Sequence, residues 1–535
     1  MNDLTKRFFA ASGWLVLLLA LVAGIAWGQA TTQSPDSGAP AAPAANADKG
    51  PQSQDNPAQG TPDKSSPDSR GRDSQPGQND QSAESGEPQG EHHITQAEAN
   101  ELFRSVDEIL SFASKDTALP IHKEVKRRLA SRDEVVAFVE KHMSDDEDAQ
   151  RLRRSELVLK KFGLLPPDFD MQKFLVALLR EQVAGYYDPK TKAVNLLDWI
   201  DAEQQKPVLA HELTHALQDQ SFGLEKFMKA ADFDVDKKKD PRPEDIDRDE
   251  ALAARQAVVE GQAMVVLLDY MLAPMGKSLL TSPDMVAALK AGMLVGTADS
   301  VTFRDAPIYL KEALTFPYRY GIDFETELLT RGGKQKAFAE AFTNPPKSTR
   351  QIMEPQTYLS GERLDPMRLP DFEHDFKSYD RFDIGAIGEF DVAVLVDQYA
   401  GAEASKRLYP HWRGGYYYTG RPKGDALAPL GLLYISRWSS AEDASDFAEI
   451  YAGYLAKRYR RAHEVEMTTV EKRQSPKLIT VSSTPATLSG KHEWLTENGP
   501  VWIEVAGNTV LVSESLDQAT TETVEREVLE GKTVK

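Results

Sequence analysis

The chain has 535 residues, of which 41% are hydrophobic, so it is long enough for more than one domain with a buried core. Its net charge of −20 argues against nucleic acid or an anionic membrane surface as the main partner. The absence of cysteine excludes disulfides, thiolate metal sites and cysteine nucleophiles.

The first 30 residues have the pattern of an export signal. Lys6 and Arg7 precede an apolar stretch over residues 8–27, and the small residues Gly28 and Ala30 close the segment. The stretch suits a cleaved signal peptide, but it is also long enough to remain as a membrane anchor. In both cases we expect the rest of the chain to be extracytoplasmic, periplasmic or secreted, with membrane contact only through an uncleaved N-terminal segment.

Residues 31–93 are rich in Pro, Ser, Gly, Gln and Asp and contain almost no large apolar side chain. Such a segment cannot bury enough surface to offset the entropy of ordering it. We therefore expect a disordered linker, which would serve either as a spacer from a membrane or wall or as a dispensable tail.

Globular sequence is predicted to begin at Ile94 with a helix-rich segment. Thr95 and Glu98 form a capping-box pattern ahead of a long helical run. Apolar and charged residues alternate over residues 121–129, which predicts a strand, and residues 151–180 are again helical with a break at residues 165–167.

A β-hairpin is predicted over residues 185–197, with its turn at residues 188–192. Its second strand directly precedes the helix described next. That strand either lies where an extended peptide substrate could add to the sheet or simply packs as an edge strand.

Residues 206–220, KPVLAHELTHALQDQ, contain the HExxH pattern. At 3.6 residues per turn, His211 and His215 lie one turn apart on one helix face, so both imidazoles can reach the same zinc ion. Glu212 lies about 100° round the helix, close enough to act as a general base without being a ligand. The alternative is a solvent-facing cluster, but the apolar stripe of this helix predicts burial, where unpaired polar groups are costly.

Zinc in a hydrolytic site needs a third protein ligand, and Glu260 is the best candidate. It lies in a strongly helical run over residues 249–271, and no other charged residue stands between Arg255 and Asp269. An isolated buried glutamate needs a partner such as a metal, whereas the alternative is an exposed glutamate on a polar face. Gly261 beside it would allow another helix to approach closely.

HELTH followed by VVEGQA resembles the gluzincin class of zinc metallopeptidases. That resemblance implies a zincin-like fold in which His211, His215 and Glu260 bind Zn²⁺ and Glu212 is the base.

More narrowly, the chain is similar to a group of exported, largely uncharacterised bacterial and archaeal metallopeptidase-like proteins. The shared stretches GYYDP, AHELTHALQDQ, VVEGQA, FPYRYG and PPKSTRQI lie within residues 185–352. Where that group tends to have a histidine after PPKSTRQI, this chain has Met353, Glu354 and Pro355, so no role of that histidine is carried over.

Four further residues are candidates for supporting roles. Tyr318, Arg319 and Tyr320 are of the types that stabilise an oxyanion, although aromatic packing is the alternative for each. Asp219, four residues after His215, could accept the second N–H of that histidine, or could simply be solvated.

Between the two ligand helices, residues 231–250 are almost all charged and are predicted as a solvated loop. Residues 371–535 are predicted as a small α+β domain of accessory or substrate-positioning role. Its clearest elements are a strand at residues 430–435, a helix at residues 441–458 and a hairpin at residues 501–512.

The sequence thus predicts an α+β protein, with a mainly helical zincin-like catalytic domain over residues 94–370 that contains a short antiparallel sheet, and the smaller α+β domain over residues 371–535. The expected function is zinc-dependent hydrolysis of peptide bonds in a protein or peptide substrate. Glu212 would activate a zinc-bound water and then protonate the leaving amine. The alternative is a non-catalytic envelope interaction protein with a structural zinc site.

Overall fold

A computed structural model describes six segments of the chain, all within one compact unit: residues 93–135, 146–182, 185–231, 240–297, 300–465 and 488–531. The predictions for residues 1–30 and for nearly all of residues 31–93 lie outside these segments. The predicted boundary between two domains at residue 370 stays a prediction.

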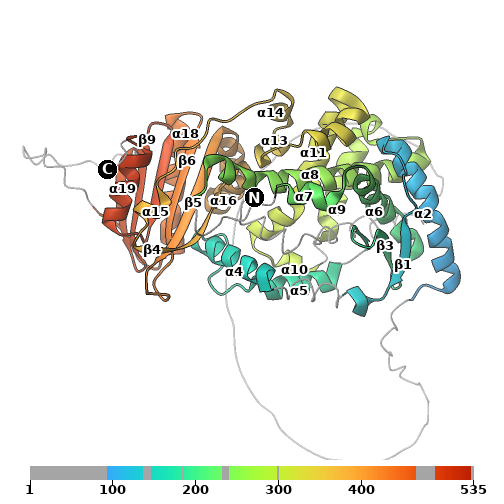
Figure 1. Cartoon of the computed structure of the whole chain (residues 1–535), viewed down its shortest axis with the longest axis horizontal. Coiled ribbons are helices and arrows are strands. Elements are labelled where there is room, and N and C mark those ends of the chain that lie inside the picture. The colour runs from blue at the N-terminus through green and yellow to red at the C-terminus, as the bar shows by residue number, and fades with distance from the viewer. Residues whose placement is uncertain are drawn as a thin grey trace, which may run out of the picture. The chain divides into compact units, whose positions relative to one another are not determined.

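The described part is a mixed helix and strand structure (Figure 1). The first and mainly helical part contains α2 (Gln96–Thr117), β1 (Lys126–Ala130), α4 (Asp146–Lys161), α5 (Met171–Gln182), β2 (Tyr186–Asp188), β3 (Ala193–Leu197), α6 (Ala202–Phe222), α7 (Leu224–Lys229), α8 (Pro243–Leu272), α9 (Pro283–Thr297), α10 (Val301–Arg304), α11 (Ile308–Lys334), the π-helix η5 (Gln335–Glu340), α12 (Ala341–Thr343), α13 (Thr349–Met353) and α14 (Pro355–Leu359). The second part contains α15 (Phe372–Asp375), β4 (Tyr379–Ala386), α16 (Glu389–Ala400), α17 (Ala402–Leu408), β5 (Trp412–Pro422), β6 (Gly431–Trp438), α18 (Ala441–Arg458), β7 (Ala462–Glu464), β8 (Gly490–Thr496), β9 (Gly499–Ala506), β10 (Thr509–Glu514) and α19 (Gln518–Val528).

A three-stranded sheet with the order β1-β3-β2 precedes helix α6. The predicted hairpin is confirmed, because β2 and β3 pair antiparallel on either side of the predicted turn. Two other expectations were wrong. The sheet is mixed rather than antiparallel, since β1 pairs with β3 in parallel, and β3 is the central strand. With both edges of β3 already paired, no peptide can add there.

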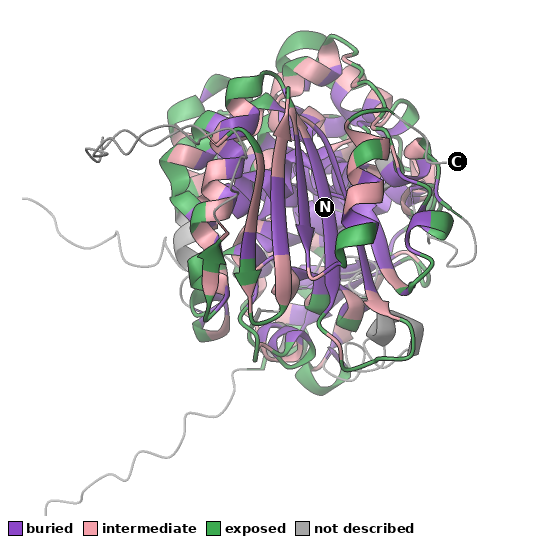
Figure 2. Cartoon of the chain, turned by 90° about the vertical axis from the view of Figure 1, so that its left-hand side faces the viewer, coloured by how far each residue is buried: buried purple, intermediate pink, exposed green. Residues whose placement is uncertain are grey.

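The second sheet has seven antiparallel strands in the order β4-β5-β6-β10-β9-β8-β7, and most of its central length is buried (Figure 2). Successive side chains of β5 alternate between its faces. Tyr418 packs on Phe376 of the segment after α15, with ring centroids 3.8 Å apart, whereas Tyr417 packs on Phe162, which follows α4. The predicted strand, helix and hairpin of this region correspond to β6, α18 and the β9–β10 pair.

Helix α8 begins at Pro243, within the expected charged loop, so the loop prediction was wrong for residues 243–250. Pro243 occupies the first turn, where its missing N–H costs nothing, and Glu244 and Asp245 complement the helix dipole. The helix is apolar and long enough to cross a membrane, but 89% of its most apolar window is buried inside the protein. We conclude that α8 is a core helix.

Helices α8 and α11 cross at two glycines. A Cβ atom at Gly261 would lie 2.4 Å from the carbonyl oxygen of Gly321, and one at Gly321 would lie 2.4 Å from that of Ala257. The backbones are therefore in direct contact, and no larger residue fits at either position. This confirms the expectation that Gly261 permits the close approach of another helix.

A buried charge network joins the helical part to the large sheet. Glu514 of β10 accepts hydrogen bonds from Arg458 at 2.8 Å and from the hydroxyls of Tyr451 at 2.6 Å and Tyr459 at 2.5 Å. Lys161 of α4 lies 3.3 Å from the same carboxylate. Burial opposes ionisation of Glu514, but the two cations outweigh it and lower its pKa to about 2. The ion pair between Lys161 and Glu514 therefore connects α4 to strand β10 of the sheet.

Arg350, in the PPKSTRQI stretch, makes a second such connection. Its guanidinium lies 2.6 Å from Glu389 of α16, 2.9 Å from Glu362 and 2.9 Å from Glu354. Since Arg350 is only 4% exposed, we assign this stretch a structural role between α13 and α16.

The helix crossing predicts opposite effects for two glycine-to-alanine substitutions. Gly261→Ala should lower the free energy of unfolding by about 1–3 kcal/mol, because the added methyl group meets backbone atoms. Gly453→Ala, on the exposed face of α18 with no atom near its Cβ position, should raise it by about 0.5–1 kcal/mol. Chemical denaturation of both variants measures the two changes, and stabilisation by Gly261→Ala would contradict the close crossing.

Candidate metal centre

Helix α6 is held rigidly at the small sheet. Asp201 caps its first turn by accepting from the backbone N–H of Glu203 at 2.9 Å. The buried Gln205 accepts from the backbone N–H of Leu197 and donates to its carbonyl, each at 2.9 Å, so the helix is tied to the last residue of β3. The HExxH stretch lies in the buried middle of this helix.

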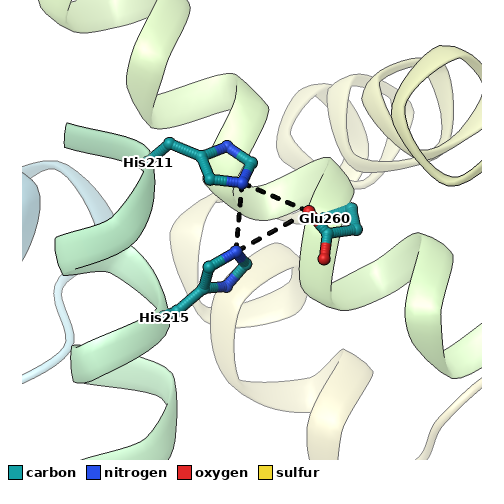
Figure 3. A group of neighbouring side chains, drawn as sticks. All are labelled: His211, His215 and Glu260. Atoms are coloured by element: carbon teal, nitrogen blue, oxygen red, sulfur yellow. Dashed lines mark hydrogen bonds and ion pairs between the residues drawn. The ribbon is translucent and has the colours of Figure 1, made fainter. Parts of the chain in front are cut away.

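His211, His215 and Glu260 meet between α6 and α8 (Figure 3). Their closest ligand atoms are 3.0 Å apart for the two Nε2 atoms, 3.2 Å for His211 Nε2 and Glu260 Oε2, and 3.6 Å for His215 Nε2 and Glu260 Oε2. All three residues are at most 2% exposed. The sequence-predicted ligand set is therefore brought together, and this buried cluster could hold a metal ion.

The donor set suits a divalent metal ion such as zinc. With bonds of about 2.0–2.1 Å to nitrogen and oxygen, a tetrahedral ion has ligand atoms about 3.3 Å from one another, and the three separations above bracket this value. Two imidazoles and one carboxylate also leave the fourth position of a tetrahedral ion without a protein ligand.

The charges within the cluster support each other. Burial alone would lower the pKa of His215, but the Glu260 carboxylate outweighs it and raises this pKa to about 9. For His211, burial dominates and lowers the pKa. Burial would likewise raise the pKa of Glu260, but His215 and His211 hold it below its usual value. Glu260 is thus an ionised carboxylate, as a metal ligand must be.

Glu212 lies beside the cluster without belonging to the ligand set. Its Oε2 accepts a hydrogen bond of 2.8 Å from the backbone N–H of Tyr187, in the edge strand β2. Its Oε1 is buried and has no hydrogen-bond partner among the described residues. Burial raises the pKa of Glu212 to about 7. One oxygen is therefore held by the backbone, and the other is available to a bound molecule.

Of the three candidates on α11, only Tyr318 lies at the cluster. Its ring stacks on His211 with centroids 6.3 Å apart. Burial raises its pKa well above the usual value, and Glu260 and Glu212 add to the shift. Arg319 instead pairs with Glu312 at 3.3 Å on the exposed side of the helix, and Tyr320 packs on Phe316. Within the described segments, neither residue contacts the cluster.

The expectation for Asp219 was wrong. The Nδ1 atom of His215 pairs with Oε1 of Gln218 at 2.9 Å, because the residue three positions on reaches this ring nitrogen. Asp219 turns toward the hairpin, where it accepts from Tyr187 Oη at 2.8 Å and pairs with Lys192 Nζ at 2.6 Å. Its spacing from His215 would have allowed either outcome. Gln218 is the hydrogen-bond partner of His215 that the sequence analysis missed.

Comparison of this chain with protein-family models, with curated proteins and with solved structures finds no match. The geometry above is therefore what supports a function.

Replacing Glu260 by glutamine should weaken metal binding more than about 100-fold, because loss of a ligand costs more than the 10–100-fold typical of an outer partner. Competition with a chromophoric chelator measures the affinity. Glu389→Gln is the matched control on α16, because Glu389 is also fully buried, burial raises its pKa to about 8, and its partner is Arg350 rather than a residue of the cluster. Wild-type affinity in Glu260→Gln would remove Glu260 from the ligand set.

Proposed function

We propose that this chain is a zinc-dependent peptidase that hydrolyses peptide bonds in a protein or peptide substrate. The observation that carries the proposal is the position of Glu212. Its carboxylate lies next to a His–His–Glu ligand set, outside that set, with one buried oxygen that has no partner among the described residues. A bound zinc ion would act as a Lewis acid on a carbonyl oxygen and would lower the pKa of a water molecule.

Glu212 has the two features of a general base. Its Oε1 can take a proton from an attacking water and pass it to the nitrogen of the leaving amine. The Tyr187 N–H holds Oε2, so the carboxylate cannot rotate away. That N–H belongs to the edge strand β2, so the hydrogen bond holds the Glu212 carboxylate at a fixed position relative to the small sheet.

Tyr318 supports the same reaction as a hydrogen-bond donor. A hydroxyl with a raised pKa keeps its proton at neutral pH, so it can donate to a carbonyl oxygen as negative charge develops there. The interaction of this hydroxyl with the Glu260 carboxylate directs it toward the ligand set.

The proposal includes a zincin-like catalytic domain of gluzincin type and export from the cytoplasm. The first rests on HELTH followed by Glu260 on a later helix, and the second on the basic and apolar pattern of residues 1–30.

A second candidate is a structural zinc site in a non-catalytic interaction protein. One observation favours it: His211 and Glu260 are 0% exposed, whereas a catalytic centre must admit its substrate. The two candidates differ in one measurement, namely whether the metal-loaded protein hydrolyses any member of a broad peptide library and loses that activity with a chelator.

Glu212→Gln should lower peptide hydrolysis by about 10²–10⁴-fold, because the amide keeps the shape of the side chain but cannot take a proton. Metal content and melting temperature should stay close to those of the wild type. Loss of the metal from this variant would instead place Glu212 among the ligands.

Tyr318→Phe should lower kcat by about 10²–10³-fold with little change in metal affinity, because only the donor to the developing charge is lost. Tyr320→Phe removes a hydroxyl two residues away that does not reach the cluster, and it should leave kcat unchanged. Equal effects of the two substitutions would argue against a role for Tyr318 in the reaction.

A further inference from the structure

A neutral amide, rather than a carboxylate, accepts from the second nitrogen of His215. Gln218 Oε1 lies 2.9 Å from His215 Nδ1, and both side chains are buried. By contrast, Nδ1 of His211 has no partner among the described residues. The two predicted histidine ligands are therefore held differently, and within the described segments only His215 has a hydrogen bond at its second ring nitrogen.

Backbone carbonyl groups determine which way this amide points. Gln218 Nε2 donates to the carbonyl oxygen of Val259 at 3.0 Å and to Gln262 Oε1 at 2.9 Å. Gln262 Nε2 donates in turn to the carbonyl oxygen of Ala337 at 2.7 Å. Since a backbone carbonyl can only accept, neither amide can flip without losing a buried hydrogen bond.

The orientation of these two amides determines which ring nitrogen of His215 carries the hydrogen. With its nitrogen committed to Val259, Gln218 presents only its oxygen to His215, so Nδ1 of the imidazole must carry a hydrogen. When the imidazole is neutral, as a metal ligand must be, its lone pair then belongs to Nε2, which is the atom that faces Glu260 and His211. A metal ion needs that lone pair.

The two hydrogen-bonded amides form an amide chain, which ends at a segment with an unusual backbone conformation. Ala337 belongs to the π-helix η5, which follows a non-helical backbone at Gly333. Gln262 is adjacent to the Gly261 crossing. The amide chain therefore spans α6, α8 and η5, three elements that are distant in sequence.

We propose that Gln218 is a positioning residue that keeps His215 ready to bind the metal, and that Gln262 acts through it by holding the Gln218 amide in place. This inference rests on the metal site of the proposed function and adds to it the group that orients one ligand. It does not require that the site be catalytic.

Metal affinity of the full-length chain, measured for Zn²⁺ by chelator competition, tests the proposal. Gln218→Leu should lower the affinity about 10–100-fold, and Gln262→Leu should lower it less. In the double variant the affinity should equal that of Gln218→Leu alone, because the two residues act in series. Additive losses would contradict the series arrangement, and wild-type affinity in Gln218→Leu would overturn the proposal.

Gln205→Leu is the matched control. Gln205 is a buried glutamine on the same helix and also bonds backbone groups, but its partners are Leu197 and Ile200. This variant should lose thermal stability with its Zn²⁺ affinity unchanged. If it loses affinity as Gln218→Leu does, general loosening of α6 explains both results, and the positioning role is wrong.

Gln218→Glu tests the role of the amide oxygen separately from that of the amide nitrogen. The carboxylate still accepts from His215 Nδ1, but its second oxygen faces the carbonyl of Val259. We expect a lower melting temperature together with a Zn²⁺ affinity closer to wild type than that of Gln218→Leu. The opposite order of affinities would contradict the proposal. These readouts need no peptide hydrolysis, so an inactive wild type would refute the peptidase and leave this test intact.

Discussion

The arrangement of the site depends on the contact between the backbones of α8 and α11. Gly261 and Gly321 allow the two helices to touch without intervening side chains. Because Glu260 and Gln262 flank Gly261, and Tyr318 lies one turn before Gly321, this contact sets the distance between them. A wider crossing would move Tyr318 away from the cluster and would shift the amide chain relative to η5.

In two networks of the core, buried charge is matched by direct partners. Glu514 has two cations and two hydroxyls, and Arg350 has three carboxylates. At the cluster, Oε1 of Glu212 and Nδ1 of His211 have no hydrogen-bond partner among the described residues. A ligand bound at the cluster could supply partners for these two groups.

The choice of an amide next to His215 has an electrostatic consequence. A divalent metal ion with the ionised carboxylates of Glu260 and Glu212 would sum to zero formal charge, which a buried site tolerates best. A carboxylate in place of Gln218 would add a further negative charge. The neutral amide orients the histidine without disturbing that balance, and its own orientation is determined by carbonyl groups of α8 and η5.

Local patterns in the sequence were enough to predict the helix with His211 and His215, the isolated Glu260, the hairpin before that helix, and three of the seven strands of the large sheet, namely β6, β9 and β10. Each depends on spacing along one element, where helical or strand periodicity dictates which side chains share a face. Tertiary structure decided the rest. The central position of β3 follows from its pairing with β1, which is distant in sequence, and the selection of Tyr318 over Arg319 and Tyr320 follows from the rotation of α11 at the glycine crossing. Likewise, Asp219 and Gln218 are both within helical reach of His215, and only the hairpin partners of Asp219 and the carbonyl of Val259 determine which one accepts from it.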